Sequence, residues 1–482
     1  MVKFIKNFSA TLLVFGFVFS FCFAQVILWN LPQIGNGSFT DLIEGDNAYF
    51  LTGGSFLMPF GQCFFAGVDK TTGNLQFCHF YQDARQTWGE ALAKTSDNNF
   101  VVLSDKQSSS PYYHFFRLIK ANTLGESLWT KEINQPAAGP YHLASFAPDS
   151  GFILGARVWN SNCVVLVRTT KNGESLWTKK GLGHESTYLS SDIRDLKSDG
   201  EIIYLLGIGY VPVPWGGSLA RTFLAKISAN GTIIQKTEYL DNDLQYGHLH
   251  GEKFAFLTDS FCLIAGTRVA VNVEDSVFIF LLKTNPNQEE VWRKFYRLQN
   301  FGFIDGYVQN LWQDENAEQI IITISLIDSL GHPAIGLIAT DLNGNLLQPL
   351  VSYRHPDYGP AALGDAIKTS DNCILLAGSV LNNSPFLLKI PNLGIGEENY
   401  GSNVLPPIKV FPSLVRKGQN IHIDLSGLLI NNSLLFYDIS GREIRKSIIT
   451  SSRFQFTTSD LKPGIYFLKI KNQTSKIVVF DR

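Results

Sequence analysis

The chain of 482 residues carries little charge, and its charges nearly cancel. Asp, Glu, Lys and Arg make up 17% of the residues, and the formal net charge is -2 at pH 7. A nucleic-acid-binding surface needs a clear excess of Lys and Arg, so this composition argues against nucleic acid as a partner. Cysteine is also scarce. Of the six cysteines, Cys22 lies in the N-terminal apolar segment, and the odd number that is left cannot all pair within one chain.

The sequence lacks the short motifs that mark common catalytic sites. It contains no G-x-S-x-G elbow, no H-E-x-x-H pair, no phosphate-binding loop and no C-x-x-C. His248, His250 and Glu252 alternate, as zinc ligands on a strand do, but no second cluster joins them. Alternating polar residues are equally typical of a solvated strand. We therefore predict no cofactor and no metal site, and we identify no catalytic residue.

One apolar run stands out, at the N-terminus. Two lysines precede an apolar stretch over residues 10–23, which ends in Cys22-Phe23-Ala24. A basic start, a short apolar run and small residues at its end predict a secretory signal peptide over residues 1–24, cleaved before Gln25. A membrane-spanning helix needs about 20 apolar residues, and no other stretch reaches this length. We expect no transmembrane segment in the mature chain.

Between residues 25 and 396 one pattern returns seven times. Each copy has a strand, a turn with Asp, two further strands, a turn with Gly, and a last strand that often carries an aromatic residue. The turns supply Asp46, Asp97, Asp149, Asp199, Asp259, Asp314 and Asp371, and then Gly73, Gly125, Gly173, Gly231, Gln288, Gly344 and Gly394. Four short strands in about 50 residues are typical of a β-propeller blade. We interpret the Asp residues, and the Lys or Arg that stands five residues before this turn position in five of the seven copies, as structural.

The seventh copy has no fourth strand, because a polar segment follows Gly394. The N-terminal strand Val26-Ile27-Leu28-Trp29 carries the expected Trp and can take that place. The sequence therefore predicts an all-β fold, with a seven-bladed β-propeller over residues 25–396. In this fold the N-terminal strand completes the last blade, so that no sheet edge stays open.

A linker over residues 397–407 leads to a second pattern of short strands over residues 408–482. Its marks are Phe411-Pro412, Asp438, Gly441-Arg442, Gly464, Tyr466 and the late Lys476. This segment resembles the C-terminal sorting domain of cargo proteins of the type IX secretion system of Bacteroidota-like bacteria. Ser413 and Leu414 stand where that family usually has Asn and Pro. The resemblance implies a small β-sandwich, the type IX secretion machinery as partner, and delivery to the outer cell surface or beyond it.

The longer loops of a propeller share one face, and recognition concentrates on such loops. Here these loops are rich in aromatic residues, which suit sugar rings and peptide side chains. We predict a ligand-binding face formed by Tyr112, Tyr113, Trp159, Trp215, Tyr246, His248, Tyr353, His355 and Tyr358. Cys63 and Cys78 flank the hairpin around Gly73 and are candidates for a cross-strand disulfide in an exported protein.

Three functions fit these observations. The first is a non-catalytic secreted or cell-surface propeller that binds an extracellular glycan or protein. The second is an extracellular hydrolase or lyase acting on polysaccharide or peptide, with carboxylates from the loop face or the central channel. The third is a structural component of the cell surface. An enzyme requires carboxylates or His that converge in the channel mouth with perturbed pKa values, whereas a binding protein requires an exposed aromatic patch without that convergence. A structural protein requires neither and should self-associate.

Overall fold

The structure of the chain is a computed structural model that describes residues 27–480 with gaps. The gaps are residues 59, 82–85, 108–113, 159–160, 162, 183–187, 214–215, 242–246, 259, 270–276, 316, 356–358, 381–383, 392–408, 412–413, 425–432, 439–441, 449–452 and 471–472. The predicted signal peptide and the predicted linker both lie outside the described residues. The chain divides into two compact units, Met1–Ile395 and Gly396–Arg482.

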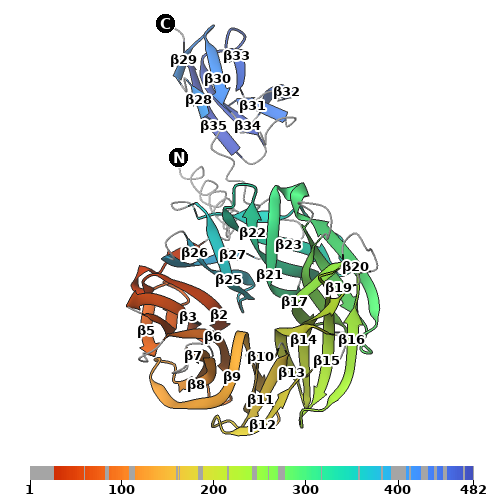
Figure 1. The fold of residues 1–482 in the computed structure, drawn as a ribbon. Helices are drawn as coiled ribbons and strands as arrows, with labels where there is room; N and C mark the ends of the chain where they lie inside the picture. The colour runs from red at the N-terminus through yellow and green to blue at the C-terminus, as the bar shows by residue number, and fades with distance from the viewer. Residues whose placement is uncertain are drawn as a thin grey trace, which may run out of the picture. The chain divides into compact units, whose positions relative to one another are not determined.

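The N-terminal unit consists of antiparallel sheets whose strands follow chain order (Figure 1). Within the described residues the only helices are two short 3-10 turns, Pro32–Ile34 and Leu298–Phe301. Four sheets have four consecutive strands each. They are β2–β5 (Gly37–Glu44, Ala48–Met58, Phe60–Asp69, Leu75–Tyr81), β13–β16 (Ser190–Asp199, Ile202–Pro212, Ser218–Ser228, Ile233–Tyr239), β17–β20 (His248–Phe256, Cys262–Val269, Val277–Thr284, Glu290–Arg297) and β21–β24 (Phe303–Asp314, Gln319–Asp328, Pro333–Asp341, Val351–Tyr353).

A larger sheet joins two repeats through one long strand. Its order is β12-β11-β10-β9-β8-β7-β6, and the long strand is β9, Ser127–Phe146. The first half of β9 pairs with β8 and the second half pairs with β10, so the strand ends one repeat and begins the next. The other strands are β6 (Thr87–Lys94), β7 (Phe100–Gln107), β8 (His114–Ala121), β10 (Gly151–Val158), β11 (Val164–Thr169) and β12 (Ser175–Lys180).

The two ends of the repeat region meet in one sheet. Strand β1 (Ile27–Asn30) pairs with β27 (Ser384–Pro391), which continues through β26 (Cys373–Val380) to β25 (Ala361–Lys368). Trp29 lies opposite Leu387 in this pairing. The predicted pairing of the N-terminal strand with the third strand of the seventh repeat is confirmed. Because the first and last residues of the repeats share hydrogen bonds, the series of sheets is fastened at its ends.

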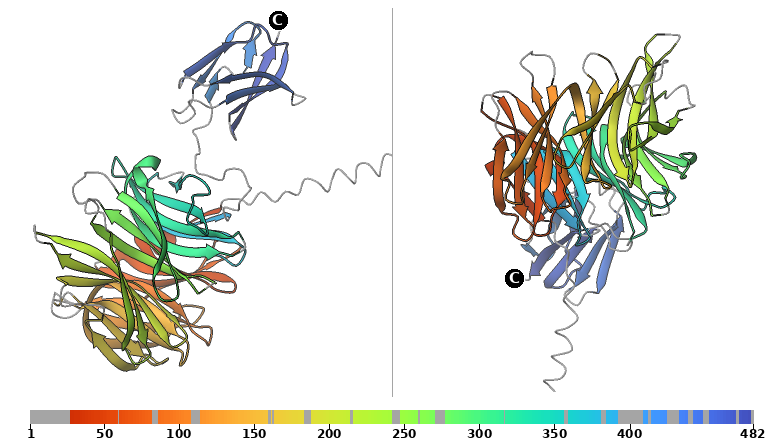
Figure 2. Two further views of the ribbon diagram at one scale, coloured as in Figure 1. Left: turned by 90° about the vertical axis from the view of Figure 1, so that its right-hand side faces the viewer. Right: turned by 90° about the horizontal axis from the view of Figure 1, so that it is seen from below.

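Neighbouring sheets contact one another in sequence order around a common centre (Figure 1). Their first strands, β2, β6, β9, β13, β17, β21 and β25, make many of these contacts, and β25 in turn contacts β2. Figure 2 shows the same sheets from two further directions. Apolar clusters fill the space between sheets, and one of them joins residues of β17–β20 to residues of β21–β23. This face-to-face burial is what a four-stranded sheet cannot obtain alone.

The recurring turn residues adopt the conformations that their repeat positions predict. Gly73, Gly125, Gly173, Gly231 and Gly344 all have φ between +70° and +81°. Gln288, which takes the Gly position in its repeat, has φ +63°. Outside glycine such a backbone conformation is uncommon, so the turn geometry is imposed by the repeat and not by the residue alone.

In the repeats of Asp97, Asp149 and Asp371, the recurring Asp forms an ion pair with the recurring cation of the same repeat. Lys120 Nζ lies 2.6 Å from Asp97 Oδ2, and Arg168 Nη2 lies 2.6 Å from Asp149 Oδ2. Lys389 Nζ lies 2.5 Å from Asp371 Oδ2 in the last repeat. Each pair ties the third strand to the first turn, which agrees with the structural role predicted for both series.

The structure corrects the predicted Cys63–Cys78 disulfide, because both thiols are free. Cys63 is paired with Tyr81 and Cys78 with Ala66, three residues apart along the hairpin. Successive side chains of a strand point to opposite faces, so an odd offset places the two thiols on opposite faces of the sheet. They accordingly pack in different apolar clusters.

The C-terminal unit contains two small sheets. One has the order β28-β30-β33 and the other β29-β35-β34-β31-β32, with β29 and β35 parallel. Their core includes Val415, Phe436 and Leu468. The strands are β28 (Lys409–Phe411), β29 (Leu414–Arg416), β30 (Asn420–Asp424), β31 (Ser433–Asp438), β32 (Glu443–Ile448), β33 (Arg453–Thr457), β34 (Gly464–Ile470) and β35 (Gln473–Phe480).

Candidate ligand site in the central cavity

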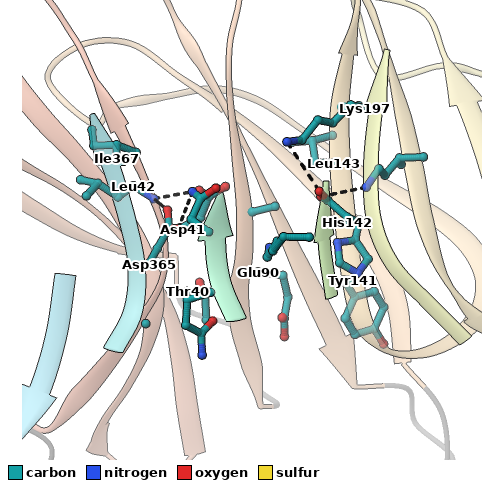
Figure 3. A pocket seen from close by; sticks show the side chains of 18 of the residues that line it. Thr40, Asp41, Leu42, Glu90, Tyr141, His142, Leu143, Lys197, Asp365 and Ile367 are labelled. Atoms are coloured by element: carbon teal, nitrogen blue, oxygen red, sulfur yellow. Dashed lines mark hydrogen bonds and ion pairs between the residues drawn. The ribbon is translucent and has the colours of Figure 1, made fainter. Parts of the chain in front are cut away.

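A cavity of about 790 Å³ lies among the first strands of the sheets (Figure 3). Its lining comes from β2, β6, β9, β13, β17, β21 and β25, so every repeat contributes to it. Along β13 the lining reaches Ser198, the residue before the turn residue Asp199. The cavity therefore extends to the face with the short Asp turns.

A β-bulge shapes the wall in most of these strands. The register shifts at Thr40 in β2, Glu90 in β6, Arg194 in β13, Glu252 in β17, Gln309 in β21 and Gly364 in β25. A bulge re-aims the side chains of the strand that carries it. The sequence signal is a pair of residues, mostly polar, that interrupts an otherwise apolar strand, as in Thr40-Asp41 and Gln309-Asn310.

Carboxylates beside the bulges form hydrogen bonds that link the first strands of adjacent repeats, the inner strands around the cavity. Asp41 accepts the amide N–H of Leu42 at 2.8 Å and, from the next sheet, the amide N–H of Leu92 at 2.6 Å. Asp195 does the same for Leu196 at 3.0 Å and Phe254 at 3.1 Å. Buried amide groups must be paired, so these carboxylates complete the backbone hydrogen bonding that the bulges disturb.

The same arrangement fastens the last repeat to the first. Asp365 Oδ2 accepts the amide N–H of Leu42 at 3.0 Å, and its Oδ1 accepts the side-chain amide of Asn310 at 3.2 Å. Asn310 also donates to the carbonyl oxygen of Ala366 at 2.7 Å. The polar groups of β21, β25 and β2 thus form one hydrogen-bonded chain around the cavity wall.

Burial dominates the electrostatics of this wall. It raises the pKa of Asp365 well above its ordinary value, and the nearby charge of Asp41 adds to the rise. Burial also raises the pKa of Asp41, against the lowering effect of the hydrogen bonds from Leu92 and Leu42. Burial alone would lower the pKa of Lys253, but the carboxylates of Asp195, Asp365 and Asp41 together raise it. Lys253 is therefore the internal counterion of the carboxylates.

Glu90, Tyr141 and His142 form a different part of the wall, on β6 and β9 (Figure 3). Burial, followed by the charge of Asp105, raises the pKa of Glu90 to about 8. Burial, followed by the charge of Lys253, lowers the pKa of His142 to about 4. At neutral pH the carboxyl is therefore mostly protonated and the imidazole is neutral.

The polar atoms of this second group are not used by the fold. Tyr141 Oη and His142 Nε2 are buried and have no hydrogen-bond partner among the described residues. Nor does any hydrogen bond between described residues involve the carboxyl group of Glu90. None of the three residues was predicted from the sequence, because Glu90 and His142 are single polar residues in strands whose pattern is otherwise that of ordinary core. The signal that could have found them is their common repeat position beside the bulges.

Of the aromatic and histidine residues predicted to bind ligand, only three are described. Tyr112, Tyr113, Trp159, Trp215, Tyr246 and Tyr358 lie outside the described residues. His355 is buried, with Nε2 2.9 Å from Asn30 Oδ1 and its ring edge-on to Phe386. Tyr353 also packs on Phe386. The structure thus gives His355 and Tyr353 contacts inside the fold, and neither lines the cavity.

The third described residue, His248, lies in β17, where its Nδ1 accepts the amide N–H of Ala220 at 3.2 Å. It is not among the residues that line the cavity. Glu252, two positions after His250, accepts hydrogen bonds from Thr267 Oγ1 at 2.9 Å and from the amide of Val308 at 2.5 Å. Over the residues that the structure describes, no group of three His, Cys, Asp or Glu is arranged to hold a metal ion.

The sorting motif is described in part. Asp438 accepts from the amide of Arg442 at 3.1 Å and from its guanidinium at 3.3 Å, which closes the turn after β31. The Tyr466 hydroxyl donates to the carbonyl oxygen of Lys462 at 2.6 Å, around the turn that leads to Gly464. Phe411 and Lys476 lie in β28 and β35, whereas Pro412 and Gly441 lie outside the described residues.

The fold so far defines an all-β, propeller-like repeat protein with a small C-terminal β-domain. Residues 409–479 match the family described as the secretion system C-terminal sorting domain. The chain is a cargo protein of the type IX secretion system, delivered to the outer cell surface or secreted beyond it. In the described part of the chain, no helix has the length and apolar character needed to cross a bilayer.

Comparison with solved structures gives distant likenesses. The chain is similar to a novel fungal alcohol oxidase of the AA5 family in complex with copper, with 10% identity and a TM-score of 0.45, covering 94% of this chain and 99% of the oxidase. It is also similar to BBS1N in its complex with ARL6DN, with 10% identity and a TM-score of 0.38, covering 69% of this chain and 88% of that one. No curated protein matches the sequence. Likenesses at this level carry no functional argument.

Proposed function

We propose that the N-terminal unit is a seven-bladed β-propeller that binds an extracellular ligand in its central cavity without transforming it. The blade count follows from treating the sheet β6–β12 as two blades that share β9. Four four-stranded sheets and the sheet closed by β1 make up the other five. The two sequence marks, Asp and Gly turns, give the same number independently.

The observation that carries the proposal is the cavity itself. Its volume of about 790 Å³ falls within the range of small-molecule sites, roughly 300–1,000 Å³. Every first strand contributes to its lining, and polar groups of that lining converge on it. A sorting domain that exports the chain places this cavity in contact with molecules outside the cell.

Binding is favoured over catalysis because most carboxylates of the wall are already committed. Asp41, Asp195 and Asp365 each accept a backbone amide N–H of an inner strand. Hydrolysis of a glycosidic bond by the common mechanism needs two available carboxyl groups on either side of the bond. In the described wall, Glu90 is the carboxyl group that no hydrogen bond to the fold engages.

One observation favours the second candidate, an extracellular hydrolase or lyase. The raised pKa values of Glu90 and Asp365 occur in the same cavity, and perturbed carboxyls of this kind are common in active sites. The two candidates differ in one measurable respect. A hydrolase or lyase releases product from its ligand, and a binding protein does not.

The test is a screen of the mature chain, residues 25–482, against glycan and peptide arrays, with product analysis for every hit. Ser145→Trp would fill the cavity, since the exposed Ser145 lines it. Ser127→Trp, at the exposed start of β9, is the matched control. We expect Ser145→Trp to weaken binding at least tenfold and Ser127→Trp to leave it unchanged. Product release would favour the enzyme, and binding insensitive to Ser145→Trp would overturn the cavity as the site.

A further inference from the structure

Resting on the proposed function, we infer that the cavity takes an uncharged, hydroxyl-rich ligand, a segment of carbohydrate, which hydrogen-bonds to Glu90, Tyr141 and His142. These residues come from two adjacent inner strands, β6 and β9, which contact each other. They line the same cavity, and the close-up shows them on neighbouring parts of its wall (Figure 3). The ligand class follows from their free hydrogen-bonding atoms and from the charge balance around them.

This part of the wall has hydrogen-bonding atoms that the fold does not use. Tyr141 Oη and His142 Nε2 are buried without a partner among the described residues, and both side chains belong to the cavity lining. A buried polar atom without a partner destabilises a fold, so two of them on adjacent residues of one cavity wall call for an external partner. Contrast the buried hydroxyl of Tyr239, outside the cavity, which donates to the carbonyl oxygen of Gln288 at 2.9 Å.

The polar groups of Glu90, Tyr141 and His142 can each both donate and accept hydrogen bonds. A tyrosine hydroxyl and a protonated carboxyl each donate one hydrogen bond and accept others, and a neutral imidazole offers one donor and one acceptor. Burial keeps Glu90 mostly protonated at neutral pH, since its pKa is raised to about 8, and keeps His142 neutral. Sugar hydroxyls, which also both donate and accept, are complementary to such a wall.

The charged groups of the wall already have ionic partners within the fold. Asp195 lies 3.6 Å from Lys197 Nζ, and Lys253 is held by the charges of Asp195, Asp365 and Asp41. A cationic ligand would compete with Lys253 for these carboxylates, and an anionic ligand would have to draw Lys253 away from them. A charged ligand of either sign would lose its hydration on entering the cavity and would only replace one ion pair by another of similar strength. A neutral ligand avoids this cost and is therefore favoured.

The wall also offers rigid apolar surface. The Tyr141 ring packs edge-on against Phe116 with ring centroids 5.7 Å apart, which fixes its orientation. Phe39 and Phe256 line the same cavity from β2 and β17. Aromatic faces of this kind suit the apolar faces of sugar rings.

The experiment compares three probes on the folded mature chain by calorimetric titration. They are a neutral cello-oligosaccharide, an anionic oligogalacturonate and a cationic chitosan oligomer. We expect the neutral probe to bind best, Tyr141→Phe and Glu90→Ala to weaken it at least tenfold, and Glu90→Gln to retain it. Tyr239→Phe, which removes a buried hydroxyl elsewhere, is the matched control and should leave affinity unchanged. Melting temperatures of all variants establish that they are folded.

The outcomes separate this inference from the proposed function. Preferred binding of a charged probe that is still blocked by Ser145→Trp would overturn the neutral ligand and leave the cavity as the site. Binding of the neutral probe that ignores Tyr141→Phe and Glu90→Ala would overturn the assignment of these residues. Failure of all three probes to bind would count against the carbohydrate, and the wider array screen would then decide the proposed function.

Discussion

The indole ring of Trp29 lies directly against the backbone of Gly73. A methyl group added at Gly73 would stand 2.0 Å from Trp29 Cδ1, well inside van der Waals contact. Trp29 belongs to β1 in the last sheet, and Gly73 belongs to the turn between β4 and β5 in the first. The same relation joins successive repeats: aromatic atoms lie within 4 Å of an added methyl group at Phe77–Gly125, Trp129–Gly173, Trp177–Gly231 and Trp292–Gly344. The contact between Trp29 and Gly73 therefore joins the last repeat to the first by the same aromatic–glycine packing that joins the other repeats.

Substitution of Gly73 tests this closure. Gly73→Ala should cost about 3 kcal/mol in the free energy of unfolding, from left-handed backbone strain plus displacement of Trp29. Gly181 has a similar φ of +72° but no atom within 4 Å of an added methyl group. Gly181→Ala should therefore cost only about 1 kcal/mol. Urea unfolding of both variants measures the difference, and equal losses would show that the Trp29 contact adds nothing.

Asp195 provides a test of the carboxylates that join the inner strands. Asp195→Ala leaves the buried amides of Leu196 and Phe254 without this acceptor, so we expect a loss of about 3 kcal/mol. Asp46, whose side chain is 84% exposed, pairs only loosely with Lys94 at 3.6 Å. Asp46→Ala should change stability by less than about 0.5 kcal/mol. A loss at Asp195 no greater than at Asp46 would contradict the structural role.

The stability that Asp195 contributes should depend on pH, because its carboxyl group ionises. Burial would raise its pKa, but the charges of Lys197 and Lys253 outweigh burial and lower it below the ordinary value of 3.8. A depressed pKa contributes stability that is present above 3.8 and is lost as the pH falls through the folded-state value. The difference between wild type and Asp195→Ala should therefore shrink on acidification below pH 3.8. Acid unfolding curves of the two proteins give this difference.

The contribution of Glu90 to the free energy of unfolding should show the opposite dependence on pH. Its pKa is raised from 4.5 to about 8, so between these values the folded chain keeps a proton that the unfolded chain has released. The contribution of Glu90 to the free energy of unfolding therefore falls as the pH rises from 4.5 to 8. Glu90→Gln removes this pH-dependent contribution. From pH 4.5 to pH 8 the free energy of unfolding of the variant should therefore rise by about 2 kcal/mol relative to wild type, less than the full pKa shift implies because water in the cavity screens the charge. A constant difference from pH 5 to pH 8 would show that Glu90 titrates normally.

Removal of the Tyr141 hydroxyl should not lower the stability of the ligand-free protein, unlike removal of most buried hydroxyl groups. Because Tyr141 Oη is buried without a described partner, Tyr141→Phe should leave stability unchanged or raise it by about 1 kcal/mol in the absence of ligand. Tyr239→Phe removes a hydroxyl that donates to Gln288, and should lower stability by about 1 kcal/mol. Thermal unfolding without ligand separates the two. Equal destabilisation would mean that Tyr141 is hydrogen-bonded within the fold.

The sequence predicted the repeats and their closure well because both rest on local signals. Gly marks most of the left-handed turns, and the spacing of the repeats placed even Gln288 at such a turn, where it has φ +63°. Pairing of β1 with β27 followed from a missing strand in the last repeat. The sorting-domain motifs at Asp438 and Gly464 are also short patterns of neighbouring residues, and the family match over residues 409–479 agrees with them.

The central site could not be read in the same way. Whether Glu90 faces the cavity or the core depends on a bulge that shifts the two-residue alternation of β6, and a bulge is set by its partner strand. The same parity explains the wrong prediction for Cys63 and Cys78, whose spacing suits a hairpin but whose offset places them on opposite faces. Clusters of aromatic residues in loops are conspicuous in the sequence, whereas the cavity is assembled from single residues on separate repeats.

The most direct test of the account is amide hydrogen exchange of the mature chain with and without a bound neutral oligosaccharide. A ligand in the central cavity should slow exchange in β6, Thr87–Lys94, and in the second half of β9, around Tyr141 and His142. Outer strands such as β12, Ser175–Lys180, should exchange as before. Protection confined to residues 108–113 and 214–215, with none in β6 or β9, would place the ligand on the aromatic loops and contradict a central site.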